Sequence, residues 1–248
     1  MTTFGRSKVA NLTQVKILER VDLTSDLWLI WIEKPEGYVF KPGQYCTIGS
    51  GGVERAYSIV SSPHEERIEL FVELVPFPDG VLTPLLWDLG VGDSVTIRPR
   101  AKGVFTFKSS HKNQLFVATV TGIAPYVSIL RNYLNQGHME HNFYLLDGAS
   151  YADELAYREE IEAIADKYPE ILTYIPTVSR PTEDRNKNWT RQTGRVNTIV
   201  EEYAKELDLK PEDTLVYACG HPGMIEDVKG RMIPKGFRVE EERFWKEE

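Results

Sequence analysis

Four neighbouring residues, Arg55-Ala56-Tyr57-Ser58, combine side chains that could bind a nucleotide. The planar guanidinium of Arg55 offers two parallel donors that match a phosphate. Side chains alternate along a strand, so Tyr57 should share a face with Arg55 and could stack its ring on a flat heterocycle. Ser58 could donate to the edge of that ring. Taken alone, the motif is explained more simply as an ordinary strand with a surface arginine and a core tyrosine.

A second candidate segment runs from Pro78 to Thr83 and reads Pro-Asp-Gly-Val-Leu-Thr. Gly80 permits close approach of the backbone to a ligand, and the start of a short helix offers free N–H groups to an anion. Thr83 could add a hydroxyl to the same site. A plain turn followed by an N-cap threonine is the simpler explanation when this segment is considered by itself.

Two glycine-containing loops occur in the second half of the chain. Residues 120–125 (Val-Thr-Gly-Ile-Ala-Pro) join a predicted strand to a predicted helix, where a dinucleotide-binding fold holds its ligand, although the usual GxGxxG pattern is absent. Residues 219–224 (Cys-Gly-His-Pro-Gly-Met) follow the last predicted parallel strand. A lone cysteine is commonly a small buried residue, but at the mouth of a sheet Cys219 could contact a ligand. His221 has no candidate metal partner, so we expect a surface residue and no metal site.

The first half of the chain is predicted to form an antiparallel β-barrel. Short runs rich in β-branched and aromatic residues alternate with turn signals such as Lys41-Pro42-Gly43. About six strands at this spacing are typical of a small barrel. The predicted strands span residues 15–21, 27–33, 44–48, 56–60, 68–75 and 94–98, and a short helix spans residues 82–89.

The second half alternates strands with helices, which predicts βαβ units and an α/β doubly wound parallel sheet. Predicted strands span residues 115–120, 143–146, 172–178 and 214–218, and helices span residues 125–135, 153–167, 196–207 and 222–232. Such a sheet binds ligands at the carboxyl ends of its strands. We therefore expect a two-domain protein, with a β-barrel over residues 1–109 and an α/β domain over residues 110–248.

Composition and charge narrow the classes of function. The 248 residues are 42% apolar and 27% charged, a normal globular balance. Cys46 and Cys219 are too few for a disulfide framework or an all-cysteine iron–sulfur cluster, and they favour a reducing compartment. The net charge of −8 argues against a nucleic-acid partner. No apolar run of roughly eighteen residues exists, and residues 1–10 do not resemble a signal peptide, so we expect a cytoplasmic protein without a membrane role.

The candidate segments occur together, in one order, along nearly the whole chain. In that combination the sequence resembles the ferredoxin–NADP reductase family, specifically its bacterial branch of compact flavodoxin/ferredoxin reductases. Each motif alone is unspecific, whereas the set is specific. The matching segments are residues 55–58 with 61–63 (flavin motif), 78–80 with 82–83 (FAD pyrophosphate loop), 121–126 with 128–131 (NADP pyrophosphate segment), 178–180 and 193–195 (2′-phosphate site), 219–224 (nicotinamide-side loop) and 242–245 (aromatic tail).

The resemblance implies an FAD site built from the barrel and the C-terminal tail. Tyr57 would stack on the isoalloxazine, Arg55 would contact the pyrophosphate, and Ser58 would lie near the flavin N5 atom. Phe244 would lie near the other flavin face and Trp245 would pack on the adenine, with anchoring of the tail in the core as the alternative. The implied FAD-binding residues are Arg55, Ala56, Tyr57, Ser58, Val75, Gly80, Val81, Leu82, Thr83, Thr121, Phe244 and Trp245.

The resemblance also implies that the α/β domain binds NADP(H). The sequence departs from the family pattern at two positions, which weakens the expected preference for NADPH over NADH. Val120 stands where many relatives have glycine. Ser150 stands where some bacterial relatives have a third arginine that binds the 2′-phosphate. Arg185 and Arg191, in the polar loop of residues 181–192, could substitute for that arginine. The implied NADP-binding residues are Thr121, Gly122, Ile123, Ala124, Pro125, Ser179, Arg180, Arg195, Cys219 and Met224, and the implied catalytic residues are Tyr57, Ser58, Cys219 and Phe244.

An acidic one-electron carrier, a ferredoxin or a flavodoxin, is the partner that the resemblance implies, together with a monomeric chain. An acidic protein can attract such a carrier only through a local basic patch. Solvated surface charge is the alternative explanation of any such cluster. The candidates are Arg98, Arg100 and Lys102 at the end of the barrel, and Lys229, Arg231, Lys235 and Arg238, which have no acid between them.

Other functions stay open from the sequence. The chain could be the reductase component of an oxygenase or could reduce free flavin, although no fused iron–sulfur domain fits here. A non-enzymatic alternative is an FAD-binding sensory module. Tyr57, Thr121 and Cys219 favour an enzyme, because they would surround the reactive centre rather than the adenine.

Overall fold

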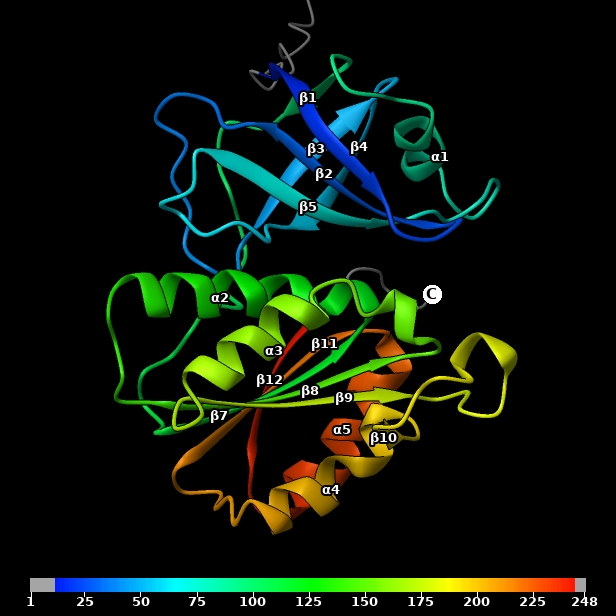
Figure 1. The fold of residues 1–248 in the computed structure, drawn as a ribbon. Coiled ribbons are helices and arrows are strands. Elements are labelled where there is room, and N and C mark those ends of the chain that lie inside the picture. Colours follow the sequence, from blue (N-terminus) through cyan, green and yellow to red (C-terminus); the bar gives the residue numbers. More distant parts are fainter. Residues whose placement is uncertain (1–11, 244–248) are drawn as a thin grey trace, which may run out of the picture.

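The computed structural model describes residues 12–243, and the first half of the chain forms a barrel-like antiparallel sheet (Figure 1). Alternation along the first strand places Val15 and Ile17 inside, with Lys16 between them in solvent. A bridge between Ile59 and Leu70 nearly closes the sheet into a barrel. The strands are β1 (Thr13–Asp22), β2 (Leu27–Glu33), β3 (Tyr45–Ser50), β4 (Val53–Ser58), β5 (Arg67–Glu73) and β6 (Ser94–Ile97), in the order β4-β3-β6-β1-β2-β5.

The second half forms a parallel sheet. Its strands are β7 (Asn113–Thr119), β8 (Asn142–Ala149), β9 (Leu172–Val178), β10 (Gln192–Thr193), β11 (Thr214–Gly220) and β12 (Arg238–Arg243), in the order β10-β9-β8-β7-β11-β12. The order reverses at β7, because β8 and β11 lie on its two sides. All residues of β11 are buried, as expected for a strand covered on both faces. The predicted fold class, an antiparallel barrel followed by a doubly wound sheet, is confirmed.

Helices cover both faces of the parallel sheet (Figure 1). The helices α2 (Ala124–Asn135) and α3 (Arg158–Lys167) lie on the face toward the barrel, and α4 (Val196–Glu206) and α5 (Pro222–Met232) lie on the other. A short helix, α1 (Leu82–Trp87), buries two leucines in the barrel core. Among residues 12–243, no helix is long and apolar enough to cross a membrane.

Besides the two-residue strand β10, which was expected to be part of a loop, two segments differ from the sequence prediction. The helix predicted over residues 153–167 is interrupted, because a 3-10 turn, η2 (Ala152–Glu154), precedes α3. The carboxylate of Glu154 accepts two backbone N–H groups from the preceding loop and holds that turn. The last strand, β12, was not predicted, since its sequence Arg-Val-Glu-Glu-Glu-Arg lacks apolar alternation. It forms through parallel pairing with β11, which satisfies its backbone groups.

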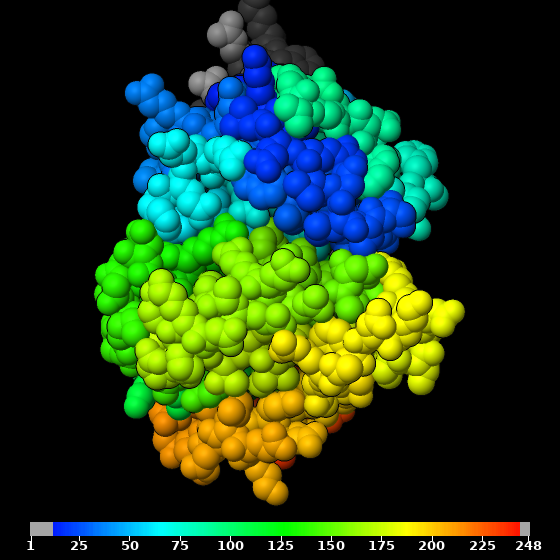
Figure 2. Space-filling view, in the orientation of Figure 1, coloured from blue at the N-terminus to red at the C-terminus, as the bar shows by residue number. Residues whose placement is uncertain are grey.

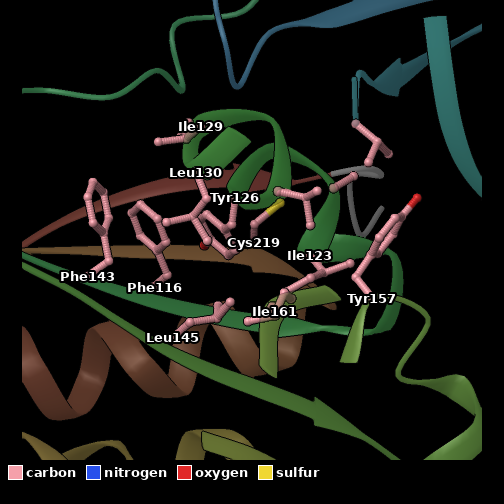
Figure 3. Packing of buried hydrophobic residues seen from close by; sticks show 14 of the residues in the cluster. Phe116, Ile123, Tyr126, Ile129, Leu130, Phe143, Leu145, Tyr157, Ile161 and Cys219 are labelled. Atoms are coloured by element: carbon pink, nitrogen blue, oxygen red, sulfur yellow. The ribbon is translucent and has the colours of Figure 1, made fainter. Parts of the chain in front are cut away.

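The junction between the two sheets is apolar at its centre, and Figure 2 shows the barrel stacked directly on the α/β part. The first two turns of α2 are buried on all sides, since the helix is enclosed between the parallel sheet and the barrel. Tyr126 and Leu130 of α2 belong to the same cluster as Phe116 of the sheet (Figure 3). Phe71 and Phe105 of the barrel join this cluster, so one continuous core connects the two parts.

One ion-pair network, centred on Arg131 of α2, also crosses this junction. Arg131 Nη1 donates to Glu69 of β5 at 2.6 Å, and its Nε and Nη2 donate to Glu160 of α3 at 2.7 Å. Tyr157 Oη donates to the other carboxylate oxygen of Glu69 at 2.9 Å. The side chain of Glu69 is only 3% exposed, and burial raises its pKa although Arg131 and Tyr157 stabilise the charged form. The buried charge of Glu69 therefore depends on Arg131.

Replacing Arg131 with leucine is expected to lower the free energy of unfolding by about 3 kcal/mol, because Glu69 then stays buried without its cation. The double variant Arg131→Leu/Glu69→Leu should recover most of this loss, since apolar residues can replace a buried ion pair at little cost. Urea denaturation followed by tryptophan fluorescence measures both changes. A single variant as stable as the parent, or a double variant no better than the single one, contradicts this account.

Candidate functional site

A cleft of about 910 Å³ lies between the barrel and the carboxyl edge of the parallel sheet. On the sheet side it opens at Thr119 and Gly220, the last residues of β7 and β11, where the strand order reverses. On the barrel side its wall includes Tyr57 of β4 and the loop that follows β5. The cleft therefore brings together the motifs of both halves of the chain.

Most of the predicted site residues line this cleft. Some predicted residues do not line it, but follow or flank lining residues along the chain: Ala56, Ser58, Gly122, Ile123, Ala124, Pro125 and Cys219. Phe244 and Trp245 lie outside the described residues. The predicted residues that line the cleft are Arg55, Tyr57, Val75, Gly80, Val81, Leu82, Thr83, Thr121, Ser179, Arg180, Arg195 and Met224.

The barrel wall carries an aromatic ring next to an unsatisfied hydroxyl. Burial raises the pKa of Tyr57, so its phenol is neutral at neutral pH. Ser58 is 6% exposed, and its Oγ has no hydrogen-bond partner among the described residues. An unpaired buried hydroxyl costs about 1–3 kcal/mol, so a ligand atom is its expected partner. Arg55 Nη1 donates to the carbonyl oxygen of Glu54 at 2.8 Å, and its other donors suit a phosphate.

The loop after β5 is closed by Gly80 and Thr83. A Cβ on Gly80 would lie 1.9 Å from the carbonyl oxygen of Val75, so the turn requires glycine. The hydroxyl of Thr83 donates to the carbonyl of Val75 and accepts from its N–H, each at 3.0 Å. The single hydroxyl proton of Thr83 is thus used within the loop, and the N–H of Gly80 donates to the carbonyl oxygen of Pro76 at 2.9 Å. Gly80, Val81 and Leu82 all line the cleft, and the N–H groups of Val81 and Leu82 are the backbone donors that could suit a phosphate.

The turn after β7 packs tightly against the end of β11. A Cβ on Gly122 would lie 2.2 Å from the carbonyl oxygen of Cys219, so no larger residue fits. Val120 opens the 3-10 turn η1 (Val120–Ile123) with a φ of 45°, a left-handed conformation that strains a β-branched residue. The valine that departs from the family pattern therefore stands where the backbone favours glycine.

Cys219 lies in the core rather than on the cleft surface. Its side chain is fully buried in the cluster that contains Ile123 and Tyr126 (Figure 3), and burial raises the pKa of its thiol. Strand β12 places Glu242 opposite Cys219 in parallel register. Burial raises the pKa of Glu242 to about 7. Glu242 does not itself line the cleft, and sequence reasoning did not single it out as a titratable group, because it stands in a run of three glutamates without any pattern.

The segments that follow β9 and β10 bring arginines to the cleft. Arg180 and Arg195 both line it, together with Ser150 and Ser179. Arg195 has no ion-pair partner within residues 12–243. Arg180 Nη1 donates to the hydroxyl of Tyr151 at 3.0 Å. These side chains form the part of the cleft best suited to a phosphate at its periphery.

The two arginines that could substitute for Ser150 do not reach the cleft. Arg185 pairs with Asp153 at 2.8 Å and with Glu154 at 3.4 Å. Arg191 pairs with Glu162 at 3.1 Å. Neither arginine lines the cleft, because carboxylates from η2 and α3 hold both side chains elsewhere.

The second predicted basic cluster is largely neutralised by the fold. Its members have no acidic neighbours between them in the sequence, but α4, α5 and β12 bring carboxylates to each of them. The cluster therefore offers an acidic partner little net positive charge. The pairs are Lys229 with Glu241, Arg231 with Asp227 and Glu201, Lys235 with Glu201, and Arg238 with Glu240.

Comparisons with known proteins agree with this geometry. Residues 116–230 match the family model of an oxidoreductase NAD-binding domain. The flavodoxin/ferredoxin–NADP reductase of Escherichia coli (strain K12) is 32% identical over 200 residues, 77% of each chain. The ferredoxin–NADP reductase of Pseudomonas aeruginosa is 28% identical over 246 residues, 93% of each chain. A solved ferredoxin NADP+ reductase from Neisseria gonorrhoeae with bound FAD and NADP has a TM-score of 0.81 and 24% identity, covering 95% of this chain and 100% of that one.

The likeness extends beyond the α/β part. The family model matches residues of that part alone, whereas the aligned regions of both relatives are longer and include barrel residues. The solved structure shows the same two-part fold. With 32% identity over 77% of both chains, the protein belongs to the flavodoxin/ferredoxin–NADP reductase family.

Proposed function

We propose that this enzyme is FAD-dependent and transfers electrons between NADPH and a one-electron carrier protein, a ferredoxin or a flavodoxin. The observation that carries the proposal is the cleft, in which the barrel wall with Tyr57 faces the loops that end β7 and β11. A hydride donor and its acceptor must lie in contact. In this cleft the barrel can bind one of them and the parallel sheet the other. The relatives from Escherichia coli and Pseudomonas aeruginosa are named for such a reaction.

The barrel residues fit FAD. When bound, FAD would accept a hydride from NADPH and release electrons one at a time. The ring of Tyr57 would stack on the flavin, and the unpartnered Oγ of Ser58 would gain its missing hydrogen bond from the ring edge. Arg55 and the backbone N–H groups of Val81 and Leu82 would hold the phosphates, while Gly80 shapes the loop and Ala56 and Val75 complete the surface. The proposal also includes the roles of Phe244 and Trp245 at the flavin and the adenine. Both residues lie outside the described residues.

The residues of the parallel sheet fit NADP(H). Thr121 and the turn of residues 122–125 would carry the pyrophosphate, and Ser179, Arg180 and Arg195 would hold the 2′-phosphate. Met224, the last residue of the nicotinamide-side loop, lines the cleft. Because the thiol of Cys219 is buried and protonated, its role here is to shape that loop rather than to react. Residues 1–109 would thus form the FAD-binding domain, and residues 110–248 would form the NADP-binding domain.

A basic patch at Arg100 and Lys102 would dock the carrier. Both side chains are exposed, and neither has an ion-pair partner among the described residues, whereas Arg98 is bound to Glu54 by two hydrogen bonds of 2.9 Å. Lys102 pairs through its backbone with Tyr45, which in turn pairs with Ser58. Lys102 is therefore separated from Ser58, at the proposed flavin site, by Tyr45 alone across the sheet. We also place the enzyme in the cytoplasm as a monomer, and its free, buried cysteines support a reducing compartment.

Reversing both charges of the patch, Arg100→Glu with Lys102→Glu, is expected to raise the KM for ferredoxin or flavodoxin about tenfold at low salt. The cause is loss of attraction between the patch and an acidic carrier. NADPH-driven reduction of the carrier, followed through cytochrome c, measures this change. Ferricyanide is small and needs no docking surface, so its reduction by the same variant should be unchanged.

The same assay separates the competing functions. Equal turnover with free flavin and with a carrier would favour a free-flavin reductase, and activity only with an oxygenase would favour a component of that system. A protein that holds FAD but does not consume NADPH would be a binding module. If the double variant has unchanged kinetics with the carrier, the proposed docking patch is wrong, while the proposed reductase reaction is unaffected.

Replacing Arg195 with leucine is expected to raise the KM for NADPH about 10- to 100-fold and to leave the KM for NADH nearly unchanged. The variant loses a charge-assisted hydrogen bond to the 2′-phosphate, a group that NADH lacks. Steady-state kinetics with both nucleotides measure the difference. Arg191→Leu is the matched control, since Arg191 precedes Arg195 by only four positions along the chain but pairs with Glu162 and does not line the cleft. Equal losses with NADPH and NADH would show that Arg195 does not recognise the 2′-phosphate.

A further inference from the structure

A carboxylate, Glu183, stands beside one of the arginines at the phosphate end of the cleft. Its Oε1 lies 3.7 Å from Arg180 Nη1. Tyr151 links the two side chains, because its hydroxyl accepts from Arg180 at 3.0 Å and donates to the other oxygen of Glu183. Arg180 lines the cleft, so any anion that binds its guanidinium also approaches this carboxylate.

The loop that carries Glu183 is folded onto the protein by Asn186. This loop extends from the carboxyl end of β9 and is coloured yellow in Figure 1. Asn186 is 2% exposed, and its side-chain amide donates to the carbonyl oxygens of Ser150 and Arg180 at 2.9 Å. The backbone N–H of Asn186 donates to the carbonyl of Glu183 at 2.8 Å. The backbone of Glu183 is therefore fixed relative to Arg180 and to the loop after β8.

Other charges in this neighbourhood do not offset Glu183. Glu154 accepts the backbone N–H groups of Ser150 and Tyr151, at 2.9 and 3.0 Å, which would otherwise suit a phosphate oxygen. The guanidinium of Arg185 lies 4.1 Å from the ring centroid of Tyr151, but it is already paired with Asp153 and Glu154. Binding of a 2′-phosphate thus depends on Arg180 and Arg195, and Glu183 opposes the first of them.

We propose that Glu183 is a specificity-determining residue that competes with a 2′-phosphate for Arg180 and lowers the preference of the enzyme for NADPH over NADH. The inference rests on the proposed function, because it concerns the nucleotide of that reaction. NADH carries an uncharged hydroxyl at the same position, so Glu183 does not repel it. A carboxylate about 5 Å from a phosphate dianion in a water-like medium changes affinity roughly tenfold.

A purely structural role for Glu183 has the opposite consequence. If the carboxylate only oriented Tyr151 and Arg180, its loss would loosen this end of the cleft and weaken every nucleotide that binds there. Competition predicts tighter binding, confined to nucleotides with a 2′-phosphate. The sign of the change and its restriction to one ligand class therefore distinguish the two roles.

The test is calorimetric titration of the FAD-loaded protein with 2′,5′-ADP and with 5′-AMP as probes. Glu183→Gln keeps the shape of the side chain and removes its charge, so it should bind 2′,5′-ADP roughly tenfold more tightly and 5′-AMP unchanged. Asp184→Asn is the matched control, because it removes the same charge from the next residue, which has no ion pair with Arg180. It should change neither affinity. The ratio of kcat/KM for NADPH to that for NADH should rise by a similar factor in Glu183→Gln alone.

The outcomes separate this inference from the proposed function. If the parent protein binds 2′,5′-ADP but Glu183→Gln binds it no more tightly, the competition is absent and the proposal is wrong, while the proposed function stands. Weaker binding of both probes to Glu183→Gln identifies a structural anchor and also overturns the proposal. If the parent protein binds neither probe, the proposed function fails and this inference fails with it.

Discussion

The buried carboxylate of Glu69 constrains how the two halves of the molecule meet. Glu69 belongs to the barrel, whereas its cation, Arg131, and its hydroxyl donor, Tyr157, belong to the α/β part. An unpaired buried charge costs about 3–5 kcal/mol, so the two parts are most stable in the arrangement that completes this pairing. The apolar cluster around α2 holds the parts together, and the network fixes their orientation. The shape of the cleft depends on both, because each sheet contributes one wall.

The shape of the cleft depends on two glycines at which one backbone segment packs closely against another. Gly122 lets the turn after β7 rest against the end of β11, and Gly80 lets the loop after β5 fold back on Val75. These contacts shape the loop after β5 and the turn after β7, from which Gly80 and Thr121 line the cleft. The unpartnered hydroxyl of Ser58 then marks the point where a ligand completes the barrel wall. At the other end, carboxylates beside Arg180 reduce the positive charge of a site that otherwise suits a phosphate.

Local patterns were enough to predict the two kinds of sheet. Short runs of β-branched and aromatic residues between turn signals identified the barrel strands, and the alternation of strands with helices placed the loops of the parallel sheet at one edge. The family resemblance added the residues of both halves that share a site, and Tyr57, Thr121 and Arg180 line one cleft. Features that depend on distant pairing were missed. Strand β12 with Glu242 is stabilised by β11 rather than by its own sequence, and the carboxylates that neutralise the cluster around Arg231 come from other elements.

The central claim is that the cleft holds NADPH in contact with FAD. Its most direct test is anaerobic mixing of the FAD-loaded protein with NADPH or NADH, followed through the visible absorbance of the flavin. The account predicts rapid loss of the oxidised flavin band with NADPH and slower loss with NADH. A protein that binds FAD and NADPH but keeps its oxidised band would contradict the claim, because its two ligands would then not meet in the cleft.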